Sequence, residues 1–166
     1  MFYYKILNCQ QTFVRFRQAF NLLIDMKMEI ELNEKTNHSL LTLVNALLHS
    51  SYQFILLRAV SINLNMNGCT WIAEKKEVKF RDSAVEILNW IQENGGYIDF
   101  ADISAPKFDE SGLDGEFVFA RWGEVDRWIK ASINIIKDEI ETSQDKKKTE
   151  AVELLENILT RIMSTN

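Results

Sequence analysis

Glycine and proline, the residues that most often end helices, are scarce in this sequence, with six Gly and one Pro among 166 residues. A β-sandwich of many strands uses these residues in its turns, whereas long stretches rich in Leu, Ile, Val, Lys and Glu are typical of helices. The length favours one domain of ordinary size with a single core. We therefore predict an all-α fold.

Apolar residues recur at spacings of three and four in four stretches, which is the pattern of amphipathic helices. These stretches cover residues 36–64, 71–94, 114–142 and 152–162. Residues 65–68 break the pattern between the first two stretches, and Gly95 and Gly96 end the second. Residues 95–113 then form a long connection, which is typical of a crossover. The predicted fold is a four-helix bundle over residues 34–166, with one long crossover between the second and third helices.

Charge and composition exclude several classes of protein. The net charge is −5 and the isoelectric point is about 5.1, which argues against a nucleic-acid binder that relies on a broad basic surface. We expect no membrane span, because no apolar run reaches the roughly 18 residues that one requires. Cys9 and Cys69 lack a C-x-x-C spacing, so they predict neither a zinc site nor a redox motif.

The N-terminal segment differs in composition from the rest of the chain. Residues 1–24 contain no Asp or Glu, and aromatic residues lie between their three basic residues. Such a segment is typical either of a mitochondrial presequence or of an amphipathic arm that docks on the domain. We assign residues 1–33 to an N-terminal arm and expect a cytoplasmic protein. A mitochondrial location is the alternative if residues 1–24 are a presequence.

The long connection carries a specific resemblance to a known family. Residues 95–106 read GGYIDFADISAP and residues 110–113 read ESGL. They resemble the segment between the second and third helices of ferritin subunits and its entry into the third helix. Residues 50–52, Ser-Ser-Tyr, are similar to the family's Ala-Ser-Tyr. The resemblance covers about residues 36–163 and implies a ferritin-like four-helix bundle.

The resemblance also implies where the metal ligands of an iron-oxidising ferritin would lie. Such ferritins hold two iron ions with carboxylates and one imidazole at the bundle centre, and a Glu-x-x-His spacing supplies part of the set. Neither His38 nor His49 has a Glu three residues before it. The family's ligand positions and a nearby tyrosine position fall on Leu47, Phe54, Phe80, Ser83 and Gly123. We therefore expect no ferroxidase centre, no tightly bound di-iron centre and no enzymatic activity, with these residues completing the core instead.

Iron can also be stored without oxidation, on subunits whose inner face offers clustered carboxylates to ferric mineral, as ferritin light chains do. The comparable segment here, residues 74–82, has four basic residues against three acidic ones, which makes a poor surface for nucleation. The simpler interpretation is a solvated helix face with i,i+4 ion pairs such as Glu77 to Arg81.

One acidic pair does match a family feature. Glu153 and Glu156 align with the two carboxylates that line the three-fold channel of ferritin cages and guide Fe(II) inward. Three subunits would bring six carboxylates to one axis, so these residues are our candidate metal site. The alternative is an ordinary exposed Glu pair on a helix. Compared with the family, we expect a short fourth helix and no fifth helix, a departure that affects closure of a shell.

The sequence thus predicts a ferritin-like subunit that contributes to iron storage and iron homeostasis within a multi-subunit shell, without ferroxidase activity of its own. Its expected partners are ferritin-like subunits, in a homo- or hetero-oligomer, and iron ions that are stored or transported. The alternative is a structural or interaction protein that keeps the bundle but no longer handles iron, and that uses its aromatic-rich arm to bind a partner.

Overall fold

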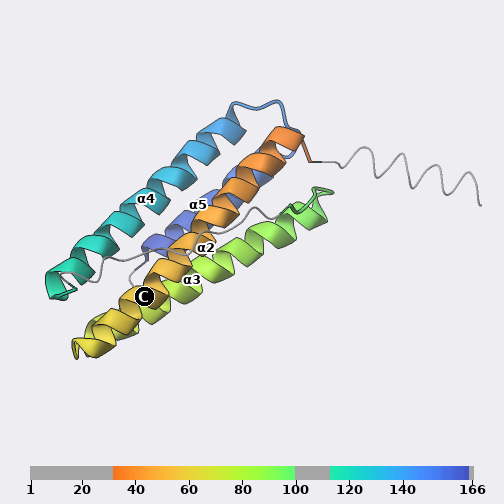
Figure 1. The fold of residues 1–166 in the computed structure, drawn as a ribbon. Helices are drawn as coiled ribbons and strands as arrows, with labels where there is room; N and C mark the ends of the chain where they lie inside the picture. The colour runs from red at the N-terminus through yellow and green to blue at the C-terminus, as the bar shows by residue number, and fades with distance from the viewer. Residues whose placement is uncertain (1–31, 100–112, 165–166) are drawn as a thin grey trace, which may run out of the picture. The chain divides into compact units, whose positions relative to one another are not determined.

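The computed structural model describes residues 32–99 and 113–164, which Figure 1 shows as four helices. These residues contain no strand, which confirms the predicted all-α class. Residues 1–31, which make up most of the predicted arm and include the candidate presequence, lie outside this description. Residues 100–112 of the connection also lie outside it.

The four helices are α2 (Glu34–Asn63), α3 (Asn67–Glu93), α4 (Gly115–Glu141) and α5 (Lys148–Met163). The prediction was wrong at the start of α3, because Asn67 and Gly68 are helical rather than part of a break. The chain turns instead at Asn65, which has a left-handed backbone with φ of 57°. Asn tolerates this conformation better than most residues, so a single residue is enough to reverse the chain between the two helices.

Two helices begin at residues whose side chains satisfy free backbone N–H groups. The Asn33 side chain accepts a hydrogen bond from the Lys35 N–H at 2.9 Å, before α2. The Asp114 carboxylate accepts one from the Phe117 N–H at 2.8 Å, at the start of α4. These caps explain why α2 and α4 begin where they do, since the first N–H groups of a helix have no partner within it.

The helices form a ring in which each packs mainly on two neighbours. Helix α2 packs on α3 and α4, and α5 packs on the same two helices. Around the bundle the order is therefore α2, α3, α5, α4, and α3 and α4 are diagonally opposite. Figure 1 shows α2 between α4 and α3, with α5 behind it.

Hydrogen bonds at one end of the bundle fix the direction of α2 relative to its neighbours. The Leu32 N–H donates to the Asn94 carbonyl at 3.1 Å, so the start of α2 lies beside the end of α3. The Ser39 hydroxyl donates to the Glu139 carboxylate at 3.1 Å, so the same part of α2 lies beside the end of α4. Helix α2 is thus antiparallel to both.

At the opposite end, Lys76 near the start of α3 donates to Asp126 in the first half of α4 and to the Ile162 carbonyl near the end of α5. Helices α3 and α4 therefore run in the same direction. The chain between Glu93 and Gly115 joins opposite ends of the bundle, across the length of a 27-residue helix, about 40 Å.

The core lies between the four helices and takes an apolar stripe from each of them. Its spacing of three and four residues is the one that the sequence predicted. The largest fully buried side chains are Phe54, Phe80, Leu40, Leu43, Leu47, Leu57, Ile87, Ile91, Ile129, Ile133, Ile140 and Leu155.

Among the helices that the structure describes, α2 alone is long and apolar enough to cross a membrane by length and composition. The reason is that Arg58 is the only charged residue in this helix after Lys35. In the structure, 56% of its most apolar window is buried within the bundle. A helix that is mostly buried in the core of a bundle meets the same criterion, so this property alone does not show that α2 crosses a membrane.

Candidate functional site

Of the five positions that the resemblance assigns to ferroxidase ligands and a nearby tyrosine, three meet at the centre of the bundle. Leu47, Phe54 and Phe80 are each 0% exposed and belong to one core cluster. The ring of Phe54 lies 5.3 Å from that of Phe80 and 6.0 Å from that of Trp122, edge to face in the second case. These contacts are the ordinary geometry of packed aromatic side chains. The centre therefore offers aromatic and aliphatic carbon at positions where a di-iron site requires oxygen and nitrogen.

Ser83, which matches a histidine ligand, is also buried, but its hydroxyl is fully used. It donates to the Lys79 carbonyl at 2.7 Å and accepts from the Arg161 guanidinium at 2.9 Å. The same guanidinium nitrogen pairs with Glu86. Ser83 thus links α3 to α5 through an arginine, which is a structural role.

Gly123, unlike the other four positions, is not buried. A Cβ atom added there would have the Arg127 guanidinium as its nearest neighbour, at 4.0 Å, so the side-chain direction is open. The neighbouring Trp122 packs on Phe54 instead. Across the described ranges, no group of three or more His, Cys, Asp and Glu side chains has a geometry that could hold a metal ion.

Glu153 and Glu156, the predicted channel residues, are exposed on α5 and lie on one face of it because they are three residues apart. The Lys137 ammonium of α4 lies 3.4 Å from the Glu156 carboxylate. With the Glu156 side chain 58% exposed, water screens this ion pair and its energy is small. The pair therefore stays accessible to a cation, with one of its two charges partly balanced.

The segment 74–82 is less solvated than the sequence predicted. The expected ion pair between Glu77 and Arg81 is present at 2.9 Å. The Lys76 side chain, however, is only 12% exposed, and its ammonium lies 3.1 Å from the Asp126 carboxylate. Lys79 also points inward, because its ammonium donates to the Ser164 carbonyl at 2.8 Å and to the Ser164 hydroxyl at 3.0 Å.

The end of α5 explains why these lysines turn inward. The last carbonyl groups of a helix have no partner within it, and basic side chains are suitable donors to them. Lys76 reaches the Ile162 carbonyl at 3.0 Å, and Lys79 reaches that of Ser164. Their aliphatic stems cover apolar surface while the ammonium groups find oxygen.

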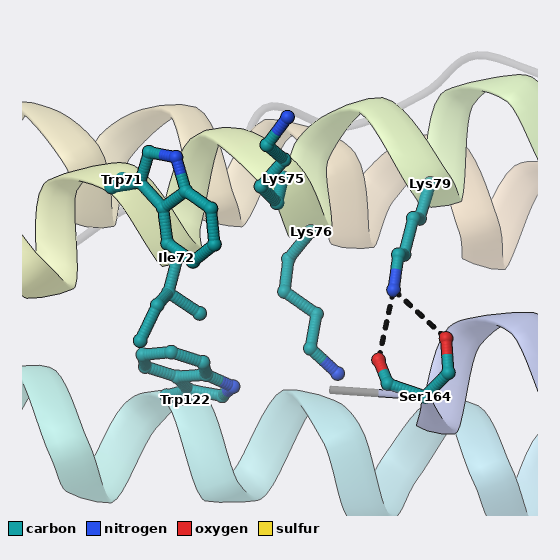
Figure 2. Close-up of a pocket in the computed structure, with 7 residues that line it drawn as sticks. All are labelled: Trp71, Ile72, Lys75, Lys76, Lys79, Trp122 and Ser164. Atoms are coloured by element: carbon teal, nitrogen blue, oxygen red, sulfur yellow. Dashed lines mark hydrogen bonds between the residues drawn. The ribbon is translucent and has the colours of Figure 1, made fainter. Parts of the chain in front are cut away.

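Beside these lysines lies a cavity of ≈ 140 Å³, which we call the α3–α4 cavity (Figure 2). It is bounded by α3, α4 and the residue that follows α5. Its lining side chains are Trp71, Ile72, Lys75, Lys76, Lys79, Trp122 and Ser164. The walls are aromatic and aliphatic at the Trp71 side and carry ammonium groups at the Ser164 side, as Figure 2 shows.

The charges around this cavity are mainly positive. Burial lowers the pKa of Lys79 below its usual 10.5, and the positive charges of Lys76, Arg161 and Lys75 lower it further. Asp126 balances Lys76 and also accepts a hydrogen bond from the Trp122 indole at 3.0 Å.

Sequence reasoning missed this cavity because it treated every lysine of the segment as solvated. A signal was present, since Lys76 lies three residues after the buried Ala73 and four before the buried Phe80. A charged residue at a core-flanking position of a helix requires a partner. Ile72, Lys76 and Lys79 share that face at the i, i+4, i+7 spacing, which aims them at one place.

No family model matches this chain, and no curated protein matches it. The likeness to ferritins thus rests on the sequences of residues 50–52, 95–106 and 110–113 and on the arrangement of the helices.

Proposed function

We propose that this chain is a ferritin-like subunit that contributes to iron storage and iron homeostasis within a multi-subunit shell, without ferroxidase activity of its own. The arrangement of the helices supports the ferritin-like part. Helices α3 and α4 run parallel on a diagonal, and a connection spanning the length of the bundle joins them. One long crossover of this kind is characteristic of ferritin-like bundles.

The packing at the bundle centre is the observation that supports a subunit without ferroxidase activity. Leu47, Phe54 and Phe80 fill it with carbon atoms, and the ring of Phe54 contacts those of Phe80 and Trp122. A buried Fe(II) ion would lose its hydration shell there without gaining oxygen ligands, and this loss would cost several kcal/mol or more of binding free energy. The subunit would therefore take part in storage through assembly and cation passage.

Glu153 and Glu156 are the groups through which this chain would contact iron. Both are exposed on α5, so neighbouring subunits could bring several such pairs together around an axis. Carboxylate oxygens are suitable ligands for a hydrated divalent cation in transit. The partners in this proposal are ferritin-like subunits, of the same or another kind, and the iron ions are cargo.

A second function is favoured by the outward face of α2. The exposed side chains of this face include Tyr52, Ile55 and Ile62, and Arg58 is the only charged residue between Lys35 and the end of the helix. An exposed apolar face of this kind is typical of a surface that contacts another protein. A structural or interaction protein with this bundle, and with no role in iron handling, would use such a face equally well.

The native mass and the bound iron of the complex isolated from its source separate these two functions. A shell of several hundred kilodaltons that contains iron supports the storage subunit. A small iron-free complex overturns it and favours the interaction protein. Iron must be measured on the same chromatographic peak as the mass, so that iron bound by other proteins is not counted.

A further inference from the structure

The α3–α4 cavity has the size and the walls of a site for a small aromatic ring. Its volume is ≈ 140 Å³, and an apolar cavity of about 150 Å³ accommodates benzene. Trp71, Ile72 and Trp122 supply flat and branched apolar surface on one side (Figure 2). Trp71 is 55% exposed, so this wall of the cavity lies at the surface of the bundle.

Lys79 gives the other side of the cavity a positive charge, and none of the carboxylates that the structure describes pairs with it. Within residues 32–99 and 113–164, its ammonium bonds only to the neutral oxygens of Ser164. An ammonium has three N–H donors, and Ser164 takes two of them. Lys76, by contrast, has Asp126 opposite it. One N–H of Lys79 therefore remains for an anion.

The distance between the apolar and the charged side indicates the length of a ligand that fits both. Ile72 and Lys79 are seven residues apart on α3, about 10 Å along the helix axis. The Lys79 side chain leans toward the end of α5 (Figure 2). A ligand whose ring is joined directly to its carboxylate is too short to reach from Ile72 to Lys79. One or two methylene groups between the ring and the carboxylate give the ligand a suitable length.

We propose that the α3–α4 cavity binds a small arylalkyl carboxylate, with its ring against Trp71, Ile72 and Trp122 and its carboxylate on the Lys79 ammonium. Ring burial and aromatic contact favour the ring. A hydrogen bond between two charged groups favours the carboxylate. Lys75, Lys76 and Arg161 add positive charge around Lys79, of which Asp126 and Glu86 balance two charges, so the surroundings of Lys79 still favour an anion over a cation. This site is separate from Glu153 and Glu156 and does not depend on them.

The test is a titration of the full chain with phenylacetate, 2-phenylethanol and acetate. The first has both ring and charge, the second has only the ring, and the third has only the charge. We expect phenylacetate to bind at least about tenfold more tightly than either of the others. The indole N–H signals of Trp71 and Trp122 should move in NMR spectra, while that of Trp128, outside the cavity, should not. Equal affinities for the three compounds, or shifts confined to Trp128, would overturn the proposal.

Variants separate the two parts of the site. Lys79→Gln should weaken phenylacetate about tenfold and leave 2-phenylethanol unchanged. Lys146→Gln makes the same change of charge in the turn between α4 and α5 and should alter neither. Ile72→Trp fills the cavity and should weaken both ring compounds.

The unmodified chain provides a check that does not depend on how the variants fold. Phenylacetate affinity should fall as the pH rises through the pKa of Lys79, which lies below 10.5, whereas 2-phenylethanol affinity should not. If neither Lys79→Gln nor this change of pH alters the affinity for phenylacetate, the assignment of the carboxylate to Lys79 is wrong.

Discussion

The side chain of Asn37 forms two hydrogen bonds with the backbone of Tyr97, sixty residues later in the chain. Its amide nitrogen donates to the Tyr97 carbonyl at 3.0 Å, and its amide oxygen accepts from the Tyr97 N–H at 3.1 Å. Asn37 is fully buried in the first turn of α2. Asn37 therefore holds the first residues of the long connection against the start of α2. Its amide group pairs with the Tyr97 backbone through one donor and one acceptor, as the backbones of two neighbouring strands do.

Asn37→Ala should destabilise the protein by about 1–3 kcal/mol, because it leaves the N–H and carbonyl of Tyr97 without these partners in a half-buried place. The free energy of unfolding, from urea titration followed by circular dichroism, measures this. Asn89→Ala, at an exposed position of α3, is the control and should change stability by less than about 0.5 kcal/mol. Equal effects of the two substitutions would contradict the anchoring role.

Gly96→Ala should destabilise by a similar or larger amount. A Cβ atom at residue 96 would lie 2.3 Å from the Asn37 amide oxygen and 2.6 Å from Ile91 Cγ2, so the backbone has to move away from α2. The same substitution at Gly68 meets nothing within 4 Å and lies in α3. Gly68→Ala should therefore stabilise, by up to about 1 kcal/mol, because Ala favours a helix more than Gly does. Thermal or urea unfolding of both variants gives the comparison.

Stability should rise with pH in a window below 10.5 because of Lys79. Its pKa in the folded protein is lowered, first by burial and then by neighbouring positive charges, so the unfolded chain binds more protons in that window. Linkage then makes the free energy of unfolding increase as the pH rises from the lowered pKa toward 10.5. The difference between the unmodified chain and Lys79→Gln, measured by urea unfolding across this window, isolates the effect. A constant difference would show that Lys79 titrates alike in both states.

The purified chain should oxidise Fe(II) no faster than buffer does. Leu47, Phe54 and Phe80 provide no ligand atoms at the bundle centre, so the reaction has no site there. Oxygen consumption with an electrode, at several protein concentrations, measures this. A saturable rate that increases with the amount of chain would overturn the proposal that the subunit lacks ferroxidase activity.

Replacing Glu153 and Glu156 together by Gln should slow iron entry into the assembled complex if these residues line a channel. The reason is that two carboxylates per subunit, which attract divalent cations, would be lost at the axis. The double variant Glu141→Gln with Glu150→Gln removes two exposed charges elsewhere on α4 and α5 and is the matched control. Equal rates of iron loading in the two double variants would leave Glu153 and Glu156 as ordinary surface residues.

Much of the fold follows from local patterns, because each helix buries one stripe of apolar residues. The spacing rule found all four helices and placed Phe54, Ile87 and Ile129 in the core. It missed the start of α3, since a single left-handed residue, Asn65, reverses the chain and Gly68 has open space beside its Cα. Composition alone does not reveal that such a Gly continues a helix.

The candidate site was harder to predict, because its contacts join helices that are distant in sequence. The position of Phe80 at the centre could be expected from its match to a ligand position. The inward turn of Lys76 and Lys79 depends on carbonyl groups at the end of α5, more than eighty residues later. No local sequence pattern predicts such a pairing. Gly123 shows a different limit, because a position that the resemblance matches to a ligand does not have to face the bundle centre.

The last helix also completes both ends of the bundle, which has a consequence for synthesis on the ribosome. The turn before α5 supplies the buried Asp145, whose carboxylate accepts the Asn33 N–H at 3.1 Å, and the end of α5 supplies the acceptors for Lys76 and Lys79. A nascent chain that has released only α2, α3 and α4 still exposes one side of its apolar core. Folding to a stable state therefore waits for α5 to emerge from the exit tunnel, and until then α2, α3 and α4 expose apolar surface of the kind that chaperones bind.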